Sequence, residues 1–292
     1  MKLYNISKTA YHEFIYGAHL TALASTSIVC TFFILFNIEI NVIALLIAYL
    51  TTFIIYSHDY QKDSSIDSEI DVEKIIYIKN RKKLYPYIIG SYIILNLFLL
   101  LLSFYIYKNY NFTIFIIIIL TGGILYTFGL KKLTKYFPGF KSIYTTALWA
   151  YAGSFFIIYY NGLDFNFIYL IMFLFIFLKL LINAIFFDIK DVNIDKKHNL
   201  KTIPILLGNN KTIILLSILN VVALIILTYT VYMGLIPSYG IILGIFFFYT
   251  EYYILKARHK NQKNILKYTY ILPDSEFILW PIFLFISKIF II

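Results

Sequence analysis

Nine long apolar segments constrain the fold of this chain more than any other feature of its sequence. A helix needs about 20 apolar residues to cross the hydrocarbon of a bilayer, whereas barrel strands are shorter and alternate in polarity. The sequence therefore predicts an all-α integral membrane protein, a bundle of nine transmembrane helices in one membrane domain over residues 1–292. The predicted spans are roughly 19–37, 41–57, 86–107, 112–129, 142–160, 166–187, 212–231, 237–255 and 274–292.

The composition supports lipid as the solvent for most of the chain. Hydrophobic residues make up 61%, charged residues only 14%, and the mean hydropathy is +0.79. A soluble domain has about a quarter of its residues charged. Cys30 is the single cysteine, which excludes an internal disulfide and a cysteine-based metal site.

The basic residues predict the orientation of the bundle. Of the 25 Lys and Arg, 22 fall in stretches that nine spans would place on one side of the membrane. Because inside loops are rich in Lys and Arg, we expect a multi-pass protein of the cell membrane with a cytoplasmic N-terminus. The net charge of +10 then reflects topology and contact with anionic lipids, not nucleic-acid binding. No feature indicates an obligate protein partner.

Two acidic stripes follow the second and the sixth predicted span. The members recur at helical spacing, so each stripe occupies one face of a helix at the cytoplasmic mouth of the bundle. Like charges on one face destabilise a helix unless a cation intervenes, and carboxylates without His or Cys ligands favour Mg²⁺. Mg²⁺ held in this way often completes its shell with substrate phosphate. The stripes are Asp59, Asp63 and Asp67, and Asp188, Asp191 and Asp195.

The stripes and their surroundings resemble the motifs of the UbiA superfamily of intramembrane prenyltransferases. The first stripe matches N/D-x-x-x-D-x-x-x-D, and the second resembles D-I-x-D-x-x-G-D, followed here by a Lys-Thr-Ile-Pro stretch over 201–204. Further matches are Asn183 five residues before the second motif, Lys74 after the first, and Tyr126, Lys131 and Lys141 between the fourth and fifth spans. The chain departs from the pattern at Asp59, where Asn is commoner, at Ile194 in place of Gly, and at Lys74 in place of Arg.

The resemblance implies a bundle around a central cavity that opens on the cytoplasmic side. It implies that the two stripes bind Mg²⁺, with two ions expected, and that Asp63, Asp191 and Tyr126 are catalytic. The expected substrates are a polyprenyl diphosphate and a lipophilic acceptor, and the activity is isoprenyl transfer. The residues expected to bind the diphosphate are Lys74, Lys131, Lys141, Lys201 and Asn183.

Several alternatives stay open at the level of sequence. The same scaffold and metals serve a polyprene cyclase, elongase or hydratase, and acidic stripes also suit an ion or phosphate transporter. Transporters place charge near the midplane of the bilayer, whereas these carboxylates lie at its edge. The sequence identifies neither the acceptor nor the length of the isoprenyl chain. The roles of Lys179, inside the sixth span, and Glu251, at the end of the eighth, are also open.

Overall fold

The protein is described here by a computed structural model, which covers residues 10–63, 72–258 and 269–291. Within these ranges it is helical and has no strand. A short helix, Ala10–Tyr16, precedes α2. The further elements are α2 (His19–Leu35), α3 (Val42–Asp63), α4 (Val72–Arg81), α5 (Tyr85–Tyr107), α6 (Tyr110–Phe128), η1 (Leu130–Lys135), α7 (Phe140–Asn161), α8 (Phe167–Lys197), α9 (Ile203–Tyr232), η2 (Ser238–Ile245), α10 (Phe246–Arg258) and α12 (Leu272–Ile291).

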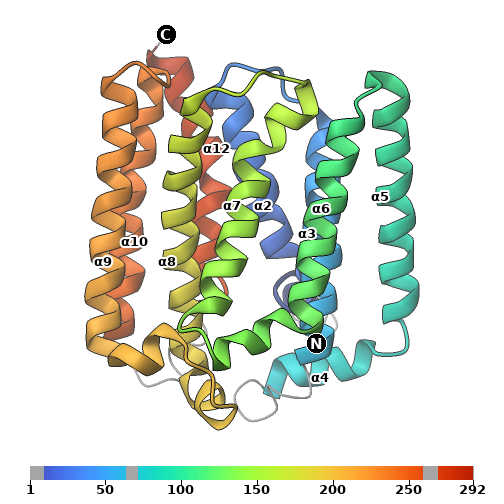
Figure 1. Ribbon diagram of the computed structural model, residues 1–292, viewed down its shortest axis with the longest axis vertical. Coiled ribbons are helices and arrows are strands. Elements are labelled where there is room, and N and C mark those ends of the chain that lie inside the picture. Colours follow the sequence, from blue (N-terminus) through green and yellow to red (C-terminus); the bar gives the residue numbers. More distant parts are fainter. Residues whose placement is uncertain (1–9, 64–71, 259–268, 292) are drawn as a thin grey trace, which may run out of the picture.

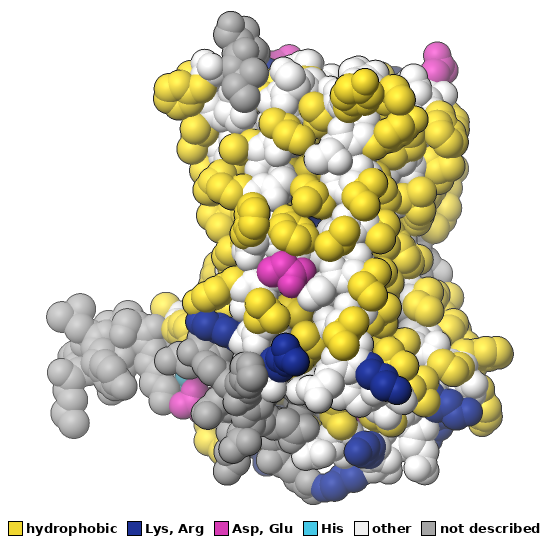
Figure 2. Space-filling view, turned by 90° about the vertical axis from the view of Figure 1, so that its left-hand side faces the viewer, with side chains coloured by type: hydrophobic (Ala, Val, Ile, Leu, Met, Phe, Trp, Pro, Cys, Tyr) yellow, Lys and Arg dark blue, Asp and Glu magenta, His cyan; other side chains and the backbone are white. Residues whose placement is uncertain are grey.

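The long helices stand side by side in one bundle, with α9 and α10 at one edge and α5 at the other (Figure 1). The short helix α4, the 3₁₀ turn η1 and the end of α8 gather at the lower end of this view. A space-filling view shows apolar side chains over the middle of the molecule and Lys and Arg side chains toward the same lower end (Figure 2). The polar end of the bundle is thus the end that carries both acidic stripes.

Each predicted span coincides with a helical segment of the described chain. Six helical segments are both long and apolar enough to cross a membrane, namely α3, α5, α6, α8, α9 and η2 with α10. The helix Ala10–Tyr16 and α2, bent by 59° at their junction, make a possible seventh. The protein is therefore a multi-helix membrane protein, while the count of nine spans and the orientation of the N-terminus stay predictions.

Two helices continue well past their predicted spans. The second span was predicted to end at residue 57 and the sixth at 187, yet α3 ends at Asp63 and α8 at Lys197. The 31 residues of α8 make a helix about 47 Å long, against about 30 Å for the hydrocarbon of a bilayer. The excess at the C-terminal end of α8 carries the second stripe, whose spacing is helical.

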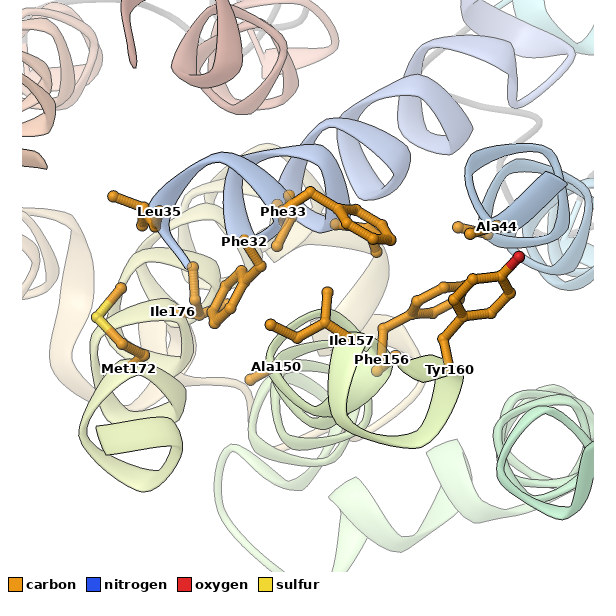
Figure 3. Packing of buried hydrophobic residues seen from close by; sticks show 14 of the residues in the cluster. Phe32, Phe33, Leu35, Ala44, Ala150, Phe156, Ile157, Tyr160, Met172 and Ile176 are labelled. Carbon is orange, nitrogen blue, oxygen red and sulfur yellow. The ribbon is translucent and has the colours of Figure 1, made fainter. Parts of the chain in front are cut away.

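Aromatic and branched side chains from three helices form the centre of the core. Phe32 and Phe33 of α2 pack with Phe156 and Ile157 of α7 and with Ile176 of α8 (Figure 3). All five are nearly or fully excluded from solvent. This apolar layer joins α2 and α7 to α8, the helix that carries the second stripe.

A glycine permits close approach of α6 to α3 just above the first stripe. A Cβ atom added to Gly123 would lie 2.6 Å from Cδ1 of Ile55, which precedes Asp59 by about one turn. By contrast, a Cβ atom on Gly90 of α5 would meet nothing within 4 Å. The contact of Gly123 therefore sets the distance between these helices.

We predict that Gly123→Ala lowers the stability of the detergent-solubilised protein by about 1–3 kcal/mol, because the new methyl group overpacks the contact with Ile55. Gly90→Ala is the matched control and should be neutral or slightly stabilising, since alanine favours helix by up to ~1 kcal/mol. The measurement is the monomer fraction that survives heating, read by size exclusion. Equal midpoints for both variants would contradict the close approach.

Candidate active site

A cavity of about 410 Å³ lies among α2, α3, α4, α6, η1, α7, α8 and α12. Both acidic stripes contribute to its walls, so carboxylates more than 120 residues apart in the sequence face one space. The predicted site residues among its lining are Asp59, Lys74, Tyr126, Lys131, Lys141, Asn183, Asp188, Asp191 and Asp195.

The first stripe is visible at Asp59, in the last turns of α3. Its Oδ1 lies 3.4 Å from Nζ of Lys131, which η1 presents. Asp63 is the final residue of α3, and its side chain lies outside the described part of the structure. Asp67 falls in the segment 64–71, also outside the described residues. The roles predicted for these two residues are therefore not tested by the geometry.

The second stripe lies on one face of α8 and is largely buried. Asp188 accepts hydrogen bonds from Ser142 Oγ at 2.6 Å and from Lys141 Nζ at 2.9 Å. Asp191 pairs with the adjacent Lys190 at 2.8 Å. Asp195 is only 4% exposed, and its Oδ2 has no hydrogen-bond partner among the described residues. A buried carboxylate oxygen without a donor is costly, which indicates that a cation belongs beside it.

The residues of the second stripe fit Mg²⁺ by the chemistry of their donors. All are hard carboxylate oxygens, and Asp195 offers a buried oxygen that receives no hydrogen bond from the described residues. Among the described residues, no three Asp, Glu, His or Cys side chains already converge as a metal site. Lysine ammonium groups pair with Asp59, Asp188 and Asp191 instead.

Lysines from four elements form the basic part of the cavity. Lys74 of α4 is 5% exposed, and its Nζ lies 4.8 Å from the centre of the Tyr60 ring. Lys190 of α8 stands over the Tyr270 ring at 5.0 Å. The remaining lining lysines are Lys131, Lys132 and Lys135 of η1 and Lys141 of α7. Several cations thus face one space, as binding of a polyanion requires.

Lys201 is the one predicted diphosphate ligand with a described side chain that does not line this cavity. Its side chain is exposed. Its backbone is structural, because the N–H donates to the Thr134 carbonyl and the carbonyl accepts from the Gly139 N–H. The backbone of Lys201 therefore helps to position η1 and the residue before α7.

Aromatic rings cover the apolar part of the cavity. Tyr126 lies nearly parallel to Tyr144, with ring centres 5.6 Å apart, and Tyr56 stacks on Trp149 at 5.3 Å. Tyr126, Tyr56 and Trp149 all line the cavity. Faces of aromatic rings stabilise cations, so this surface suits an allylic cation and an isoprenyl tail.

The profile of the UbiA prenyltransferase family matches residues 80–272, more than half of the chain. The chain belongs to the UbiA prenyltransferase family. The resemblance predicted from the two stripes is thereby confirmed. A comparison with curated proteins gives no match.

Solved structures share the fold of this chain, among them those of UbiA homologues. A UbiA homologue from Archaeoglobus fulgidus bound to DMAPP and Mg²⁺ has 16% identity and a TM-score of 0.62, over 94% of this chain and 98% of that one. The apo structure of a homologue from Aeropyrum pernix K1 has 10% identity and a TM-score of 0.65, with the same coverage. A digeranylgeranylglyceryl phosphate synthase has 20% identity and a TM-score of 0.53, again over 94% and 98%. At these identities the likeness concerns the fold alone.

Sequence reasoning missed several lining residues of this UbiA-family cavity. Lys190 lies between Asp188 and Asp191, and this position inside the second motif could have indicated that it lines the cavity. Asp274 opens α12 and accepts hydrogen bonds from Asn183 Nδ2 and Thr21 Oγ1. No spacing rule links Asp274 to either stripe, because it reaches the cavity only through the packing of α12 against α2.

Lys179 and Glu251 belong to a polar network outside the cavity. Lys179 Nζ lies 2.6 Å from Glu276 Oε1 and also donates to Thr250 and Asn220. Asn220 donates in turn to Glu251. Lys179 therefore neither faces the cavity nor reaches for the membrane surface, and the network links α8, α9, α10 and α12.

A cluster of polar and charged side chains connects α4 to the short helix Ala10–Tyr16. Glu13 forms an ion pair with Arg81 and accepts a hydrogen bond of 2.6 Å from the hydroxyl of Tyr77. Burial raises the pKa of the Tyr77 hydroxyl, so this group stays protonated and donates. Because α4 also carries Lys74, the cluster positions a cavity lysine from a distance.

We expect Arg81→Gln to weaken binding of geranyl diphosphate about 3- to 10-fold, in line with loss of ~1 kcal/mol from a partly exposed ion pair. Exchange of the charges, Glu13→Arg with Arg81→Glu, should recover part of the affinity. Lys83→Gln removes an equal charge from an exposed position and is the control. Equal losses in Arg81→Gln and Lys83→Gln would show that only net charge matters.

Proposed function

We propose that this chain is a Mg²⁺-dependent prenyltransferase that moves an isoprenyl group from a polyprenyl diphosphate to a lipophilic acceptor. The observation that carries the proposal is the meeting of both stripes in one cavity with several lysines. The related Archaeoglobus fulgidus protein has been solved with DMAPP and Mg²⁺, and also with GPP and Mg²⁺, which supports the same ligand class here.

The carboxylates that would hold the metal are Asp59, Asp63 and Asp67 on one side and Asp188, Asp191 and Asp195 on the other, with two ions expected. When bound, Mg²⁺ offsets the charge of the diphosphate and stabilises it as a leaving group. Lys131, Lys141 and Lys190 already neutralise Asp59, Asp188 and Asp191. These ammonium groups can also donate to diphosphate oxygens, as can the buried Lys74.

The aromatic wall of the cavity would bind the isoprenyl tail and stabilise the allylic cation. An isoprenyl tail that enters from the bilayer would lie along Tyr56, Tyr126 and Trp149. Rings in this position exclude water from the allylic carbon and stabilise its positive charge. We place Tyr126 nearest the reacting carbon, because it lies in the last turn of α6, immediately before the basic η1.

The ion-site alternative receives less support from the geometry. Separate ion sites do not require the two stripes to face one space, whereas a single bridging diphosphate does. Cyclisation, elongation or hydration on the same scaffold would use the same residues. Prenyl transfer is preferred because it is the activity that names the family.

We expect Asp191→Asn to lower isoprenyl transfer by about two to three orders of magnitude, since the variant loses both a metal ligand and a partner of Lys190. A chelator should abolish wild-type transfer, and added Mg²⁺ should restore it. Asp164→Asn makes the same chemical change at an exposed turn between α7 and α8, so it should stay active. The assay follows radiolabelled geranylgeranyl diphosphate, and full activity of Asp191→Asn or in chelator would refute the proposal.

The proposed topology has nine spans, a cytoplasmic N-terminus and the cavity on the cytoplasmic side. Single cysteines at the exposed positions Asn193 and Asn161, in a Cys30→Ser background, test it with a membrane-impermeant thiol reagent. In right-side-out vesicles only the cysteine at 161 should react, because α8 crosses between the two positions. Reaction of both cysteines from outside would contradict the topology.

A further inference from the structure

One carboxylate of the cavity belongs to neither stripe. Asp274 lies in the first turn of α12, lines the cavity and is 5% exposed. Asp59, Asp188 and Asp191 each pair with a lysine, whereas Asp274 has no ion pair with any residue that the structure describes. A carboxylate that is buried this deeply and has no ion pair must be stabilised by other contacts.

Neutral donors hold Asp274 in place. Oδ1 accepts from Asn183 Nδ2 at 3.0 Å, and Oδ2 accepts from Thr21 Oγ1 at 2.8 Å. The two contacts come from α8 and α2, so three helices meet at this carboxylate. Each carboxylate oxygen has two lone pairs, and one donor to each leaves acceptor capacity toward the cavity. Asp274 is therefore both positioned and able to accept one more hydrogen bond.

The surroundings of Asp274 differ from those of the stripes. Thr21 also lies 3.4 Å from the hydroxyl of Tyr60, and Ser25 is a further hydroxyl of the lining. The donors to Asp274 are thus one hydroxyl and one amide, whereas lysines pair with Asp59, Asp188 and Asp191. An acceptor with its own negative charge here would be repelled by Asp274, whereas a neutral hydroxyl could donate to it.

Isoprenyl transfer to a hydroxyl releases a proton that a protein group must take. The bond between C1 and the bridging oxygen breaks, and its electron pair leaves with the diphosphate. A bond forms between C1 and the acceptor oxygen, which then gives up its proton. Three of the four described stripe carboxylates are already paired with lysines, which makes them poor proton acceptors.

We propose that Asp274 is a catalytic residue that binds the hydroxyl of an uncharged, lipophilic acceptor and takes its proton. This inference rests on the proposed function and names the class of acceptor. Thr21 and Asn183 act as positioning residues, because their hydrogen bonds orient the carboxylate. The lysines proposed to bind the diphosphate form no ion pair with Asp274, so loss of Asp274 should impair transfer and leave diphosphate binding intact.

The test uses geranylgeranyl diphosphate as donor and two neutral hydroxyl probes, 1-O-hexadecylglycerol and 4-nonylphenol. Hexadecanoate is the charged counterpart. Wild-type protein should form an ether with at least one neutral probe and no ester with hexadecanoate. Asp274→Asn should lower the turnover number at least 100-fold, within the usual range for loss of a general base, with donor Kd changed less than about 3-fold. Asp164→Asn, the same change at an exposed turn, should match wild type.

Every other result counts against the inference. No ether from either neutral probe, with the donor still bound, would overturn the assignment to a hydroxyl acceptor. Equal turnover by Asp274→Asn, or loss of its donor binding, would overturn the role in proton transfer. If that variant does not fold, Asp274→Glu takes its place and must lower turnover without weakening donor binding. A wild-type protein that binds no donor would instead refute the proposed function itself.

Discussion

Four carboxylates of the two stripes lie within one cavity at the end of the bundle, where like charges raise one another's energy. Their balance by cations is the constraint on which the surrounding structure depends. Lysines of η1, α7 and α8 supply it at Asp59, Asp188 and Asp191. The elements that carry these lysines, η1, α7 and α8, must then bring them close to the carboxylates of α3 and α8.

The lipid accounts for the rest of the architecture. Backbone groups within a bilayer must be satisfied inside the chain, so the apolar segments are helices. Among the described helices, Lys179 and Glu276 form a deeply buried ion pair, and Lys179 also donates hydrogen bonds to Thr250 and Asn220. Removal of one partner of such a pair costs about 3–5 kcal/mol, so the network joins four helices firmly without contact with the cavity.

The sequence predicted features that depend on local periodicity. It located the helices, because apolar runs and helical spacing are properties of neighbours in the chain. It also predicted helix beyond the sixth span, because Asp188, Asp191 and Asp195 recur at helical spacing, and α8 continues to Lys197. The cavity that Asp59 and Asp191 share was expected only from the resemblance to a known family. Asp274 and Lys201 show the limit, because only tertiary packing decides that the first enters the cavity and the second does not.

The central claim is that the two stripes bind one diphosphate, and a double-variant cycle on its affinity tests this most directly. Dissociation constants of geranylgeranyl diphosphate with Mg²⁺ are measured for wild type, Asp59→Asn, Asp191→Asn and the double variant. Residues that share one ligand should show a coupling energy of about 0.5–3 kcal/mol. Losses that add to within ~0.5 kcal/mol would mean that the stripes act on separate ligands, and would contradict the account.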